Sequence, residues 1–405
     1  MDAVGIHEGD ANRNVHSSNH WIRMLESSMK ARKLMFVLGG ATLVAASSMA
    51  QVPDLLNALD AGGRAMGAGG AFYSTGSDTL STYYNPAGLG YVGQGQVGLA
   101  YRNLPESKTK ASNEFGSLRL DSDGDKGGNA ITHLGIAMPL GDGRRGTLGV
   151  GFTIGGFIDD TREDDGVLVG GNPVNAYSEK IKARSEYFTV AYGKSDPNQG
   201  FSWGAGLQYV RQYISNNVLL VDSGNNVLLD ADLEDTGSGI GFIIGVQFSP
   251  RGNSNMSIGL SYRSEVDLNG NETTDQLYDK IPARLMGGIA LRQDGFRGGR
   301  DFLVYGAQVQ HFFGGDSSQV FDRSDQTVLG IGAEYNYHFS GYRIPVRVGF
   351  NAVPGGGDDF GRRNTFTFGL GFRPLDNRFA VDFNFATPSN GGYDLGISLN
   401  YRFGN

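Results

Sequence analysis

Apolar residues alternate with small or polar residues along fourteen stretches of the chain. In the last stretch every second residue from Leu395 to Phe403 is apolar, and the residues between them are small or polar. A period of two with one apolar face is typical of a β-strand that separates two different environments. The pattern therefore predicts a chain built of such strands.

The connections between these stretches are alternately long and short. We expect strands at 96–104, 131–138, 147–158, 186–192, 201–213, 239–248, 256–262, 284–292, 302–312, 328–337, 346–351, 365–372, 378–385 and 393–403. Short connections lie at 139–146, 194–200, 249–255 and 375–377, and long polar ones at 103–130, 159–185, 215–238 and 264–281. Turns on one side and loops on the other predict an all-β fold, a fourteen-stranded antiparallel transmembrane β-barrel over residues 93–405.

The segment before the first strand, residues 51–92, has no strand pattern but many small residues and turn formers. Fourteen strands enclose a lumen too wide for ordinary side chains to fill. We therefore expect residues 51–92 to form an N-terminal hatch in the lumen. Its predicted lock is the turn Asn85-Pro86-Ala87, where Pro86 biases Asn85 toward an extended backbone and leaves the Asn85 side chain free to bond nearby backbone.

An apolar stretch before the hatch is too short to span a bilayer as a helix. Lys30, Arg32 and Lys33 precede an apolar core at 34–46, and small residues follow up to Ala50. This order predicts a secretory signal peptide at 29–50, and residues 1–28 are then an extension upstream of the native start. Export of a barrel-forming chain predicts a place in the bacterial cell outer membrane.

Composition agrees with a barrel and excludes other classes. Only 39% of residues are hydrophobic and the mean hydropathy is -0.27, which excludes a membrane protein of many helices. Gly accounts for 64 of 405 residues, against a usual share of about 7%. The net charge of -8 without a basic cluster makes nucleic acid an unexpected partner, and the lack of Cys excludes disulfides.

Strand parity places a set of polar residues in the lumen: Gln96, Arg102, Gln208, Arg263, Glu334, Arg347, Asp382, Asn384 and Arg402. Buried charges are costly unless they are paired or hydrated. Two interpretations stay open. The residues form an electrostatic ladder that fixes the hatch, or they form a polar track that escorts the head group of an amphiphile.

Two further features are candidates for function. Gly155 and Gly156 break the alternation of their strand, and paired glycines accept bulge geometry. They form a candidate lateral gate through which cargo passes sideways into the bilayer; the alternative is that they only begin the outer loop. Tyr401 and Phe403 end the apolar face of the last strand, and we expect them to be the assembly signal read by the barrel-assembly machinery.

No pattern predicts an enzyme, a cofactor or a metal site. Residues 200–204 have the spelling of a nucleophile elbow but lead into a strand. His133, His311 and His338 lie on separate strands, so local spacing builds neither a triad nor a metal site. We expect the acidic loops at 121–125 and 159–165 to be solvated surface beside lipopolysaccharide, with loose divalent-cation binding as the alternative.

The run GGRAMGAGGAFYSTGSDTLSTYYNPAGLG, residues 62–90, resembles the N-terminal hatch of the FadL/TodX family of outer-membrane transporters. The Asn-Pro-Ala of that hatch is matched by Asn85, Pro86 and Ala87. The resemblance implies a fourteen-stranded barrel with a kinked third strand, and passive uptake of hydrophobic or amphipathic small molecules such as long-chain fatty acids or hydrocarbons. The run also resembles the PorV/PorQ branch, which implies an alternative: a non-transporting outer-membrane scaffold whose partners are secretion-machine proteins.

Overall fold

The computed structural model describes residues 61–405 apart from 116–117, 142–144, 165–167, 170–171, 197, 199, 223–225, 251–254, 270–279, 315, 318–321, 324, 355–362, 389–392 and 405. The expected signal peptide at 29–50, the extension at 1–28 and the first hatch residues, 51–60, lie outside the described residues. Within the described part, no helix has the length and apolar character needed to cross a membrane.

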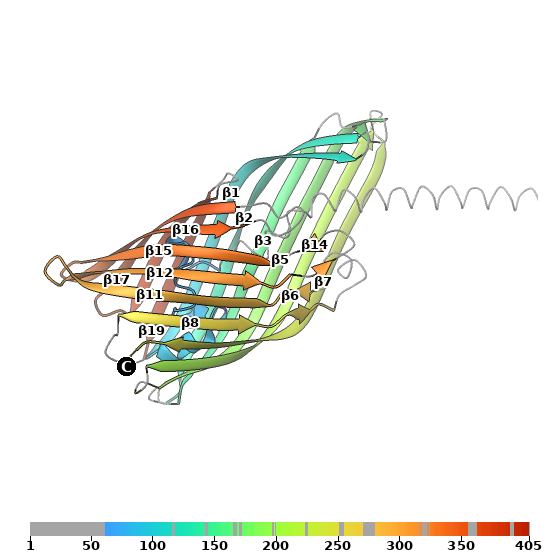
Figure 1. The fold of residues 1–405 in the computed structure, drawn as a ribbon. Coiled ribbons are helices and arrows are strands. Elements are labelled where there is room, and N and C mark those ends of the chain that lie inside the picture. The colour runs from blue at the N-terminus through green and yellow to red at the C-terminus, as the bar shows by residue number, and fades with distance from the viewer. Residues whose placement is uncertain are drawn as a thin grey trace, which may run out of the picture. The chain divides into compact units, whose positions relative to one another are not determined.

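Fourteen long strands form one closed antiparallel barrel in the described part of the chain (Figure 1). They are β1 (Gly95–Phe115), β2 (Leu118–Pro139), β3 (Thr147–Asp164), β5 (Asn172–Asp196), β6 (Phe201–Asp222), β7 (Val227–Phe248), β8 (Met256–Arg263), β11 (Arg284–Phe296), β12 (Asp301–Phe312), β15 (Gln326–His338), β16 (Tyr342–Val353), β17 (Arg363–Pro374), β18 (Phe379–Pro388) and β19 (Asp394–Phe403). Each pairs with the next long strand, and the pairing of β1 with β19 closes the ring. Two-residue strands also occur among the described residues: β4 (Leu168–Val169), β9 (Val266–Asp267), β10 (Lys280–Ile281), β13 (Asp316–Ser317) and β14 (Asp322–Arg323).

The predicted fold class and all fourteen predicted strands are confirmed. Three of the expected long loops are wrong, because their strands continue. In the loop expected at 103–130, β1 reaches Phe115 and β2 begins at Leu118; in that at 159–185, β3 reaches Asp164 and β5 begins at Asn172; in that at 215–238, β6 reaches Asp222 and β7 begins at Val227. The ladder of backbone hydrogen bonds does not need an apolar face. Where a strand leaves the bilayer for water, its apolar alternation ends although the pairing goes on.

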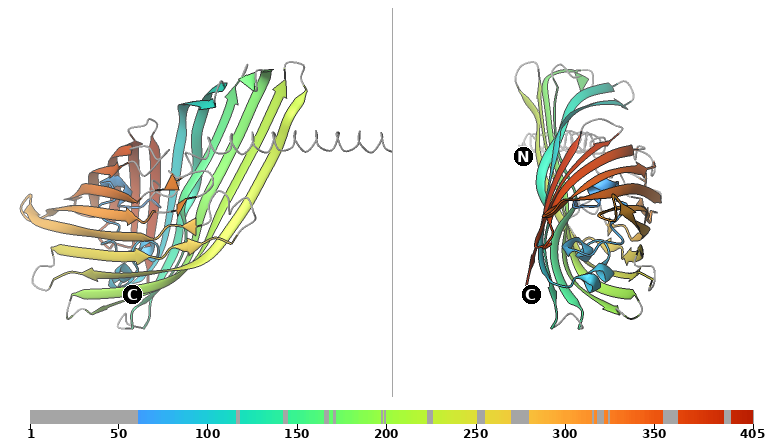
Figure 2. Two further views of the ribbon diagram at one scale, coloured as in Figure 1. Left: turned by 45° about the vertical axis from the view of Figure 1, so that its right-hand side comes forward. Right: turned by 90° about the vertical axis from the view of Figure 1, so that its left-hand side faces the viewer.

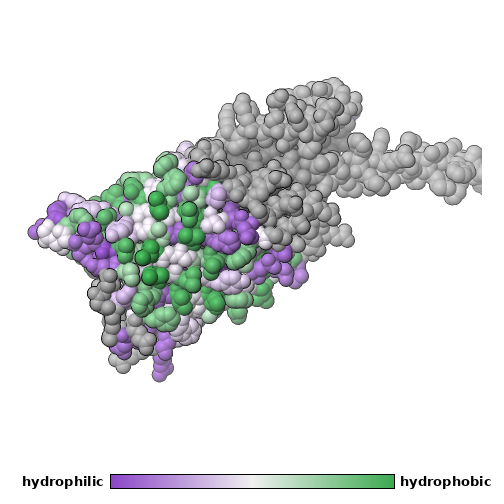
Figure 3. Space-filling view, viewed as in Figure 1, coloured by the Kyte–Doolittle hydropathy of each residue, from purple (hydrophilic) through white to green (hydrophobic). Residues whose placement is uncertain are grey.

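Outward and inward side chains of the barrel differ sharply in character. Outward residues are apolar and exposed, as in Leu207 (66%), Ile240 (76%) and Phe366 (66%). On the face shown in Figure 3, hydrophobic residues gather in the middle of the described surface and hydrophilic residues lie mainly toward its ends. Inward neighbours such as Gln208 and Arg347 are fully buried. An apolar surface of this extent is stable against lipid rather than water.

Residues 61–92, called the inner segment from here on, run inside the barrel (Figure 2); they are the described residues of the range 51–92, for which a hatch remains a prediction. They contain three 3₁₀ helices: η1 (Met66–Ala68), η2 (Thr79–Thr82) and η3 (Pro86–Tyr91). The helices pack on different parts of the wall: η1 on β15–β18, η2 mainly on β1–β3, and η3 mainly on β5–β7. The inner segment therefore crosses the lumen and contacts most of its circumference.

The last strand ends at Phe403, whose backbone is paired with Gly95 of β1. Tyr401 lies two residues earlier on the same face of the strand, and its side chain is 54% exposed on the lipid face. A Cβ atom at Gly95 would overlap the Phe403 ring, so that ring lies across the seam where the barrel closes. The seam and the expected assembly signal thus share one residue.

Phe403→Ala should lower the amount of folded barrel in the outer membrane several-fold and leave export to the periplasm intact, because it removes the terminal aromatic at the closing seam. The measurement is the heat-modifiable band of isolated outer membranes. Phe339→Ala is the matched control, since Phe339 is an exposed aromatic (40%) that follows β15. Equal barrel yield for both variants would count against the prediction.

Candidate functional site

The Asn85-Pro86-Ala87 turn is buried between the inner segment and the wall. Asn85 is fully buried, has an extended backbone (φ -153°, ψ 101°) and caps η3, with Pro86 at the first position. Its Nδ2 donates to the carbonyl oxygens of Ser74 (2.7 Å) and of Val246 on β7 (3.2 Å), and its Oδ1 accepts from the amide of Ala87 (3.1 Å). One side chain closes the turn and attaches the inner segment to the wall.

The wall carries glycine where this turn meets it. A Cβ atom at Gly245 on β7 would overlap the Asn85 amide, and one at Gly204 on β6 would overlap the backbone of Pro86. Next to them, Ser202 on β6 donates to the carbonyl oxygen of Ala87 (2.6 Å). Only a residue without a side chain permits so close an approach. The glycines of β6 and β7 are therefore part of the docking surface.

A network of five charged side chains joins the inner segment to strands β15–β18. Arg64 of the inner segment holds Glu334 on β15 with two hydrogen bonds, from Nε (2.6 Å) and Nη2 (2.9 Å). Arg347 on β16 also donates to Glu334 (2.6 Å) and lies 2.7 Å from Asp382 on β18, which Arg373 on β17 contacts at 3.0 Å. Arg347 is fully buried. Each charge in this ionic network faces an opposite one, as burial requires.

Other expected lumen residues form contacts of their own outside the ionic network. Arg102 on β1 is buried against Asp394 on β19, with Nε 3.3 Å from Oδ1. Gln208 on β6 is buried and donates to a threonine of β5 (3.0 Å). Gln96 and Arg402 are register partners on β1 and β19. The structure therefore brings Glu334, Arg347 and Asp382 together, and it separates the remaining residues into smaller groups.

The ladder between β2 and β3 is interrupted beside the candidate gate. Its register passes from His133–Thr153 directly to Gly127–Asp159, so residues 154–158 of β3 have no register partner on β2, although all of them except Gly155 pair with β5. The β3–β5 register also shifts between Ile154 and Gly156, which leaves Gly155 as a bulge. A β-bulge bends the strand and disrupts local pairing. Gly155 and Gly156 thus lie at the edge of a break in the wall.

The inner segment covers this break from inside. A Cβ atom at Gly155 would lie 2.6 Å from the hydroxyl of Tyr83 and 2.6 Å from the ring of Tyr187. The Thr132 hydroxyl on β2 donates to the carbonyl oxygen of Ala61 (2.7 Å). Thr132 is itself skipped in the β1–β2 register, so both strands that flank the break are bulged there.

Below the break, His133 bridges the wall and the inner segment. Its Nδ1 lies 2.9 Å from the Thr153 hydroxyl on β3, and its Nε2 lies 3.0 Å from the Thr79 hydroxyl of η2. The ring is 1% exposed. Both ring nitrogens are thus occupied by hydroxyl groups. Among the described residues, no group of three His, Asp or Glu side chains is placed to hold a metal ion.

A cavity of about 490 Å³ lies at the short-turn end of the lumen, below the inner segment. Its lining includes Asp78, Arg343, Gln96 and Arg402, together with residues of the ionic network. Asp78 caps η2 by accepting from the amide of Leu80 (3.0 Å), and burial raises the pKa of the Asp78 carboxyl. Because this cavity lies next to the inner segment, the lumen is narrow where the inner segment crosses it and wider toward the short turns.

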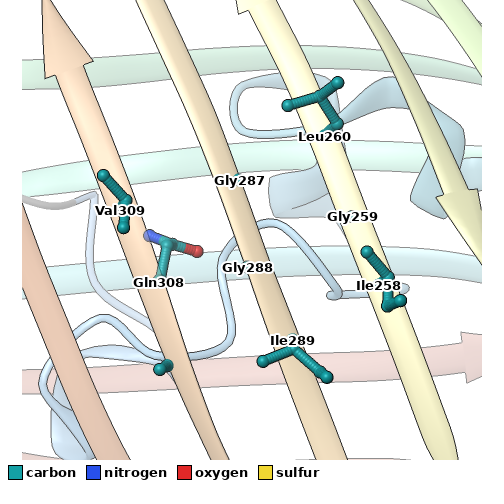
Figure 4. A pocket seen from close by; sticks show the side chains of 9 residues that line it. Ile258, Gly259, Leu260, Gly287, Gly288, Ile289, Gln308 and Val309 are labelled. Atoms are coloured by element: carbon teal, nitrogen blue, oxygen red, sulfur yellow. The ribbon is translucent and has the colours of Figure 1, made fainter.

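A second hollow, of about 530 Å³, lies on the outer face of the barrel (Figure 4). Ile258 and Leu260 of β8 and Val309 of β12 surround the bare backbone of Gly287 on β11. These three side chains are 41 to 47% exposed, so they face outward with the rest of the apolar band. The hollow is part of the lipid-facing surface and separate from the lumen.

Strand parity identifies Glu334, Arg347 and Asp382 but misses their partners Arg64 and Arg373. Arg64 is the one charged residue between positions 61 and 77 of the sequence, which is a usable signal. Arg373 follows two inward glycines on its strand and so has inward parity. Neither observation predicts which residue forms the ion pair, because Arg64 and Glu334 are 270 positions apart in the sequence.

Glu334→Gln should lower the free energy of unfolding by about 3–5 kcal/mol, because it leaves the buried Arg347 without one of its two carboxylates. The measurement is urea unfolding in lipid vesicles, followed by the fluorescence of Trp203. Glu265→Gln is the control: Glu265 is 45% exposed and 3.6 Å from Lys280, so its loss should cost at most about 1 kcal/mol. Similar losses for the two variants would contradict the structural importance of the ionic network.

Comparison with protein-family models finds no match, and comparison with curated proteins finds none. Among solved structures, the chain is similar to a FadL homologue of Pseudomonas aeruginosa, at 14% identity and a TM-score of 0.56 over 84% of this chain and 98% of that chain. The toluene transporter TodX of P. putida matches at 13% identity and a TM-score of 0.55, over 84% and 98%. A deltaS2 mutant of the TodX monoaromatic hydrocarbon channel matches at 14% and 0.56, over 86% and 100%. The chain therefore has the FadL/TodX-like barrel fold, as the resemblance of residues 62–90 implies.

Proposed function

We propose that the protein is an outer-membrane transporter for the passive uptake of hydrophobic or amphipathic small molecules, of the long-chain fatty acid or hydrocarbon type. The observation that carries the proposal is the interruption between β2 and β3, where residues 128–132 of β2 and 154–158 of β3 are not register partners. Solved structures of the same fold are described as a toluene transporter and a monoaromatic hydrocarbon channel. A passage for water-soluble solutes would need an open lumen rather than a broken wall.

The proposed route runs sideways through Gly155 and Gly156. A hydrophobic molecule loses its burial on entering water but keeps it on moving into the bilayer. Half-exposed Ile131 on β2 borders the interruption, so the break meets the loop-side part of the apolar band. Tyr83 and Tyr187 offer an apolar inner surface at the same place.

The inner segment acts as the hatch in this proposal. It prevents free diffusion, and the Asn85 hydrogen bonds with the ionic network hold it in place. The proposed partners of the whole protein belong to the outer membrane. The signal peptide at 29–50 directs export, the barrel-assembly machinery recognises Tyr401 and Phe403, and the outward faces of the barrel contact lipid and lipopolysaccharide.

A PorV-like scaffold for protein secretion is the second candidate function. Strands β1, β2, β5, β6 and β7 have 21 to 25 residues each, about twice what a bilayer requires. They project beyond the shorter strands (Figure 1) and offer a surface for a protein partner. Copurification of secretion-machine proteins, with no uptake of labelled fatty acid by liposomes, would favour this function over transport.

Replacing Asn85 and Pro86 by Ala should raise ion conductance in planar bilayers and leave the barrel folded, because the turn loses its hydrogen bonds to Ser74 and Val246. Asn351→Ala is the control, since Asn351 also bonds the inner segment but only once, to the carbonyl oxygen of Gly69 (3.2 Å), whereas Asn85 forms three bonds. Unchanged conductance with a lower yield of folded barrel would make the motif a folding element instead.

Gly155→Val with Gly156→Val should abolish liposome uptake of labelled fatty acid, with glucose as the control solute, and leave outer-membrane abundance unchanged. The side chain added at position 155 fills the bulge against Tyr83 and Tyr187. Normal uptake by the double variant would place the exit elsewhere or exclude transport.

A cross-linking test avoids any effect of bulky side chains on folding. The chain has no Cys, so Asn129→Cys with Gly156→Cys introduces two thiols on either side of the break. A thiol cross-linker across the break should stop uptake. The control is Ile136→Cys with Val150→Cys, because these two positions are paired on the same strands. The same cross-linker applied to this control should leave uptake unchanged.

A further inference from the structure

Two buried arginines lie opposite each other inside the barrel. Arg263 ends β8 and Arg284 begins β11, and the two residues are register partners. Their exposed fractions are 3% and 4%. Side chains at directly opposite positions of an antiparallel pair are near neighbours, and like charges there destabilise the sheet.

No described carboxylate forms an ion pair with either guanidinium. Arg263 lies over the rings of Tyr187 (4.7 Å) and Tyr83 (5.3 Å), and Arg284 donates to the carbonyl oxygen of Tyr83 (3.2 Å). The Nε and Nη1 atoms of Arg263 are buried and have no hydrogen-bond partner. Aromatic faces attract a cation but leave its N–H groups without acceptors.

The ionic network shows how this chain otherwise treats a buried arginine. Arg347 is just as buried, and it contacts both Glu334 and Asp382. Arg263 and Arg284 have the same burial without such partners. Two uncompensated charges and free donors in one place are the features of a site for an anion.

The surroundings of the arginine pair match an amphiphile. Ile281 and Met286 are fully buried beside Arg284 in the chain, and Val266 is buried beyond the end of β8; all three belong to the apolar cluster inside the barrel. Tyr83 and Tyr187, which lie under Arg263, are also the rings that face Gly155 at the break in the wall. The pair therefore lies between apolar side chains and the proposed route.

We infer that Arg263 and Arg284 bind the dianionic head group of an amphiphile, a phosphate monoester, whose alkyl chain packs against the adjacent apolar cluster. The inference rests on the proposed function and narrows its cargo. A phosphate monoester carries nearly two negative charges at neutral pH and three acceptor oxygens, which suits two guanidinium forks. A carboxylate balances only one of the two charges.

The test measures binding by the purified full chain in a non-ionic detergent. Calorimetric titration at about pH 8, above the second phosphate pKa of roughly 6, compares dodecyl phosphate, dodecanoate and dodecanol, which share one alkyl chain. Dodecyl phosphate should bind about tenfold or more tightly than dodecanoate, since only the phosphate balances both guanidinium charges and offers three acceptor oxygens. Arg263→Gln with Arg284→Gln should remove this preference and leave dodecanol binding unchanged.

Arg292→Gln is the matched control. It removes the same charge from β11, but from a half-exposed arginine paired with Asp294 at the other end of the strand. Arg284→Lys keeps the positive charge and should keep part of the preference for dodecyl phosphate over dodecanoate. This variant provides a test of the inference even if the double Gln variant does not fold. Equal binding of phosphate and carboxylate by the unmodified protein would overturn the inference, and so would a preference that survives the double substitution. Absence of dodecanol binding would overturn the proposed transport as well.

Discussion

Backbone pairing in lipid is the constraint on which the rest of this structure depends. No water is present in the hydrocarbon region to bond an unpaired N–H or C=O group, so the strands must close on themselves. The pairing of β1 with β19 provides that closure. Closure also creates a new requirement, because a ring of this many strands encloses a lumen too wide for its own side chains to fill. The inner segment, with its three short helices against three sectors of wall, follows from that geometric necessity.

Filling the lumen with a chain segment brings polar backbone and charged side chains into a buried space. The structure meets this with two devices. Glycines such as Gly204 and Gly245 let the inner segment approach the strand backbone closely enough for Asn85 to bond it. Opposite charges such as Arg347 and Glu334 neutralise each other where they are buried. The arginine pair of β8 and β11 follows neither rule, and that departure sets it apart from the other polar groups of the lumen.

The parts of the fold that sequence reveals are those where lipid imposes a pattern. Period two is plain from Leu395 to Phe403 because every second side chain meets hydrocarbon. Residues 104–130 still belong mostly to β1 and β2, but their sequence lacks the alternation of apolar and polar residues that marks a strand in lipid. The site behaves similarly. Parity shows that Glu334 points inward, whereas its bond to Arg64 depends on where the inner segment folds, which no local pattern records.

The break in the wall combines what sequence shows with what it hides. Gly155 and Gly156 are visible as an interruption of the pattern, but Thr132, the bulged residue on the facing strand, has nothing in its sequence context to mark it. Thr132 donates to Ala61 at the start of the inner segment, and Tyr83 of the same segment lies against Gly155. Both edges of the break are thus held by one segment. Because that segment is also fixed by Asn85 and by the ionic network, a displacement of the inner segment removes the support of the break, and the two elements are coupled through contiguous contacts.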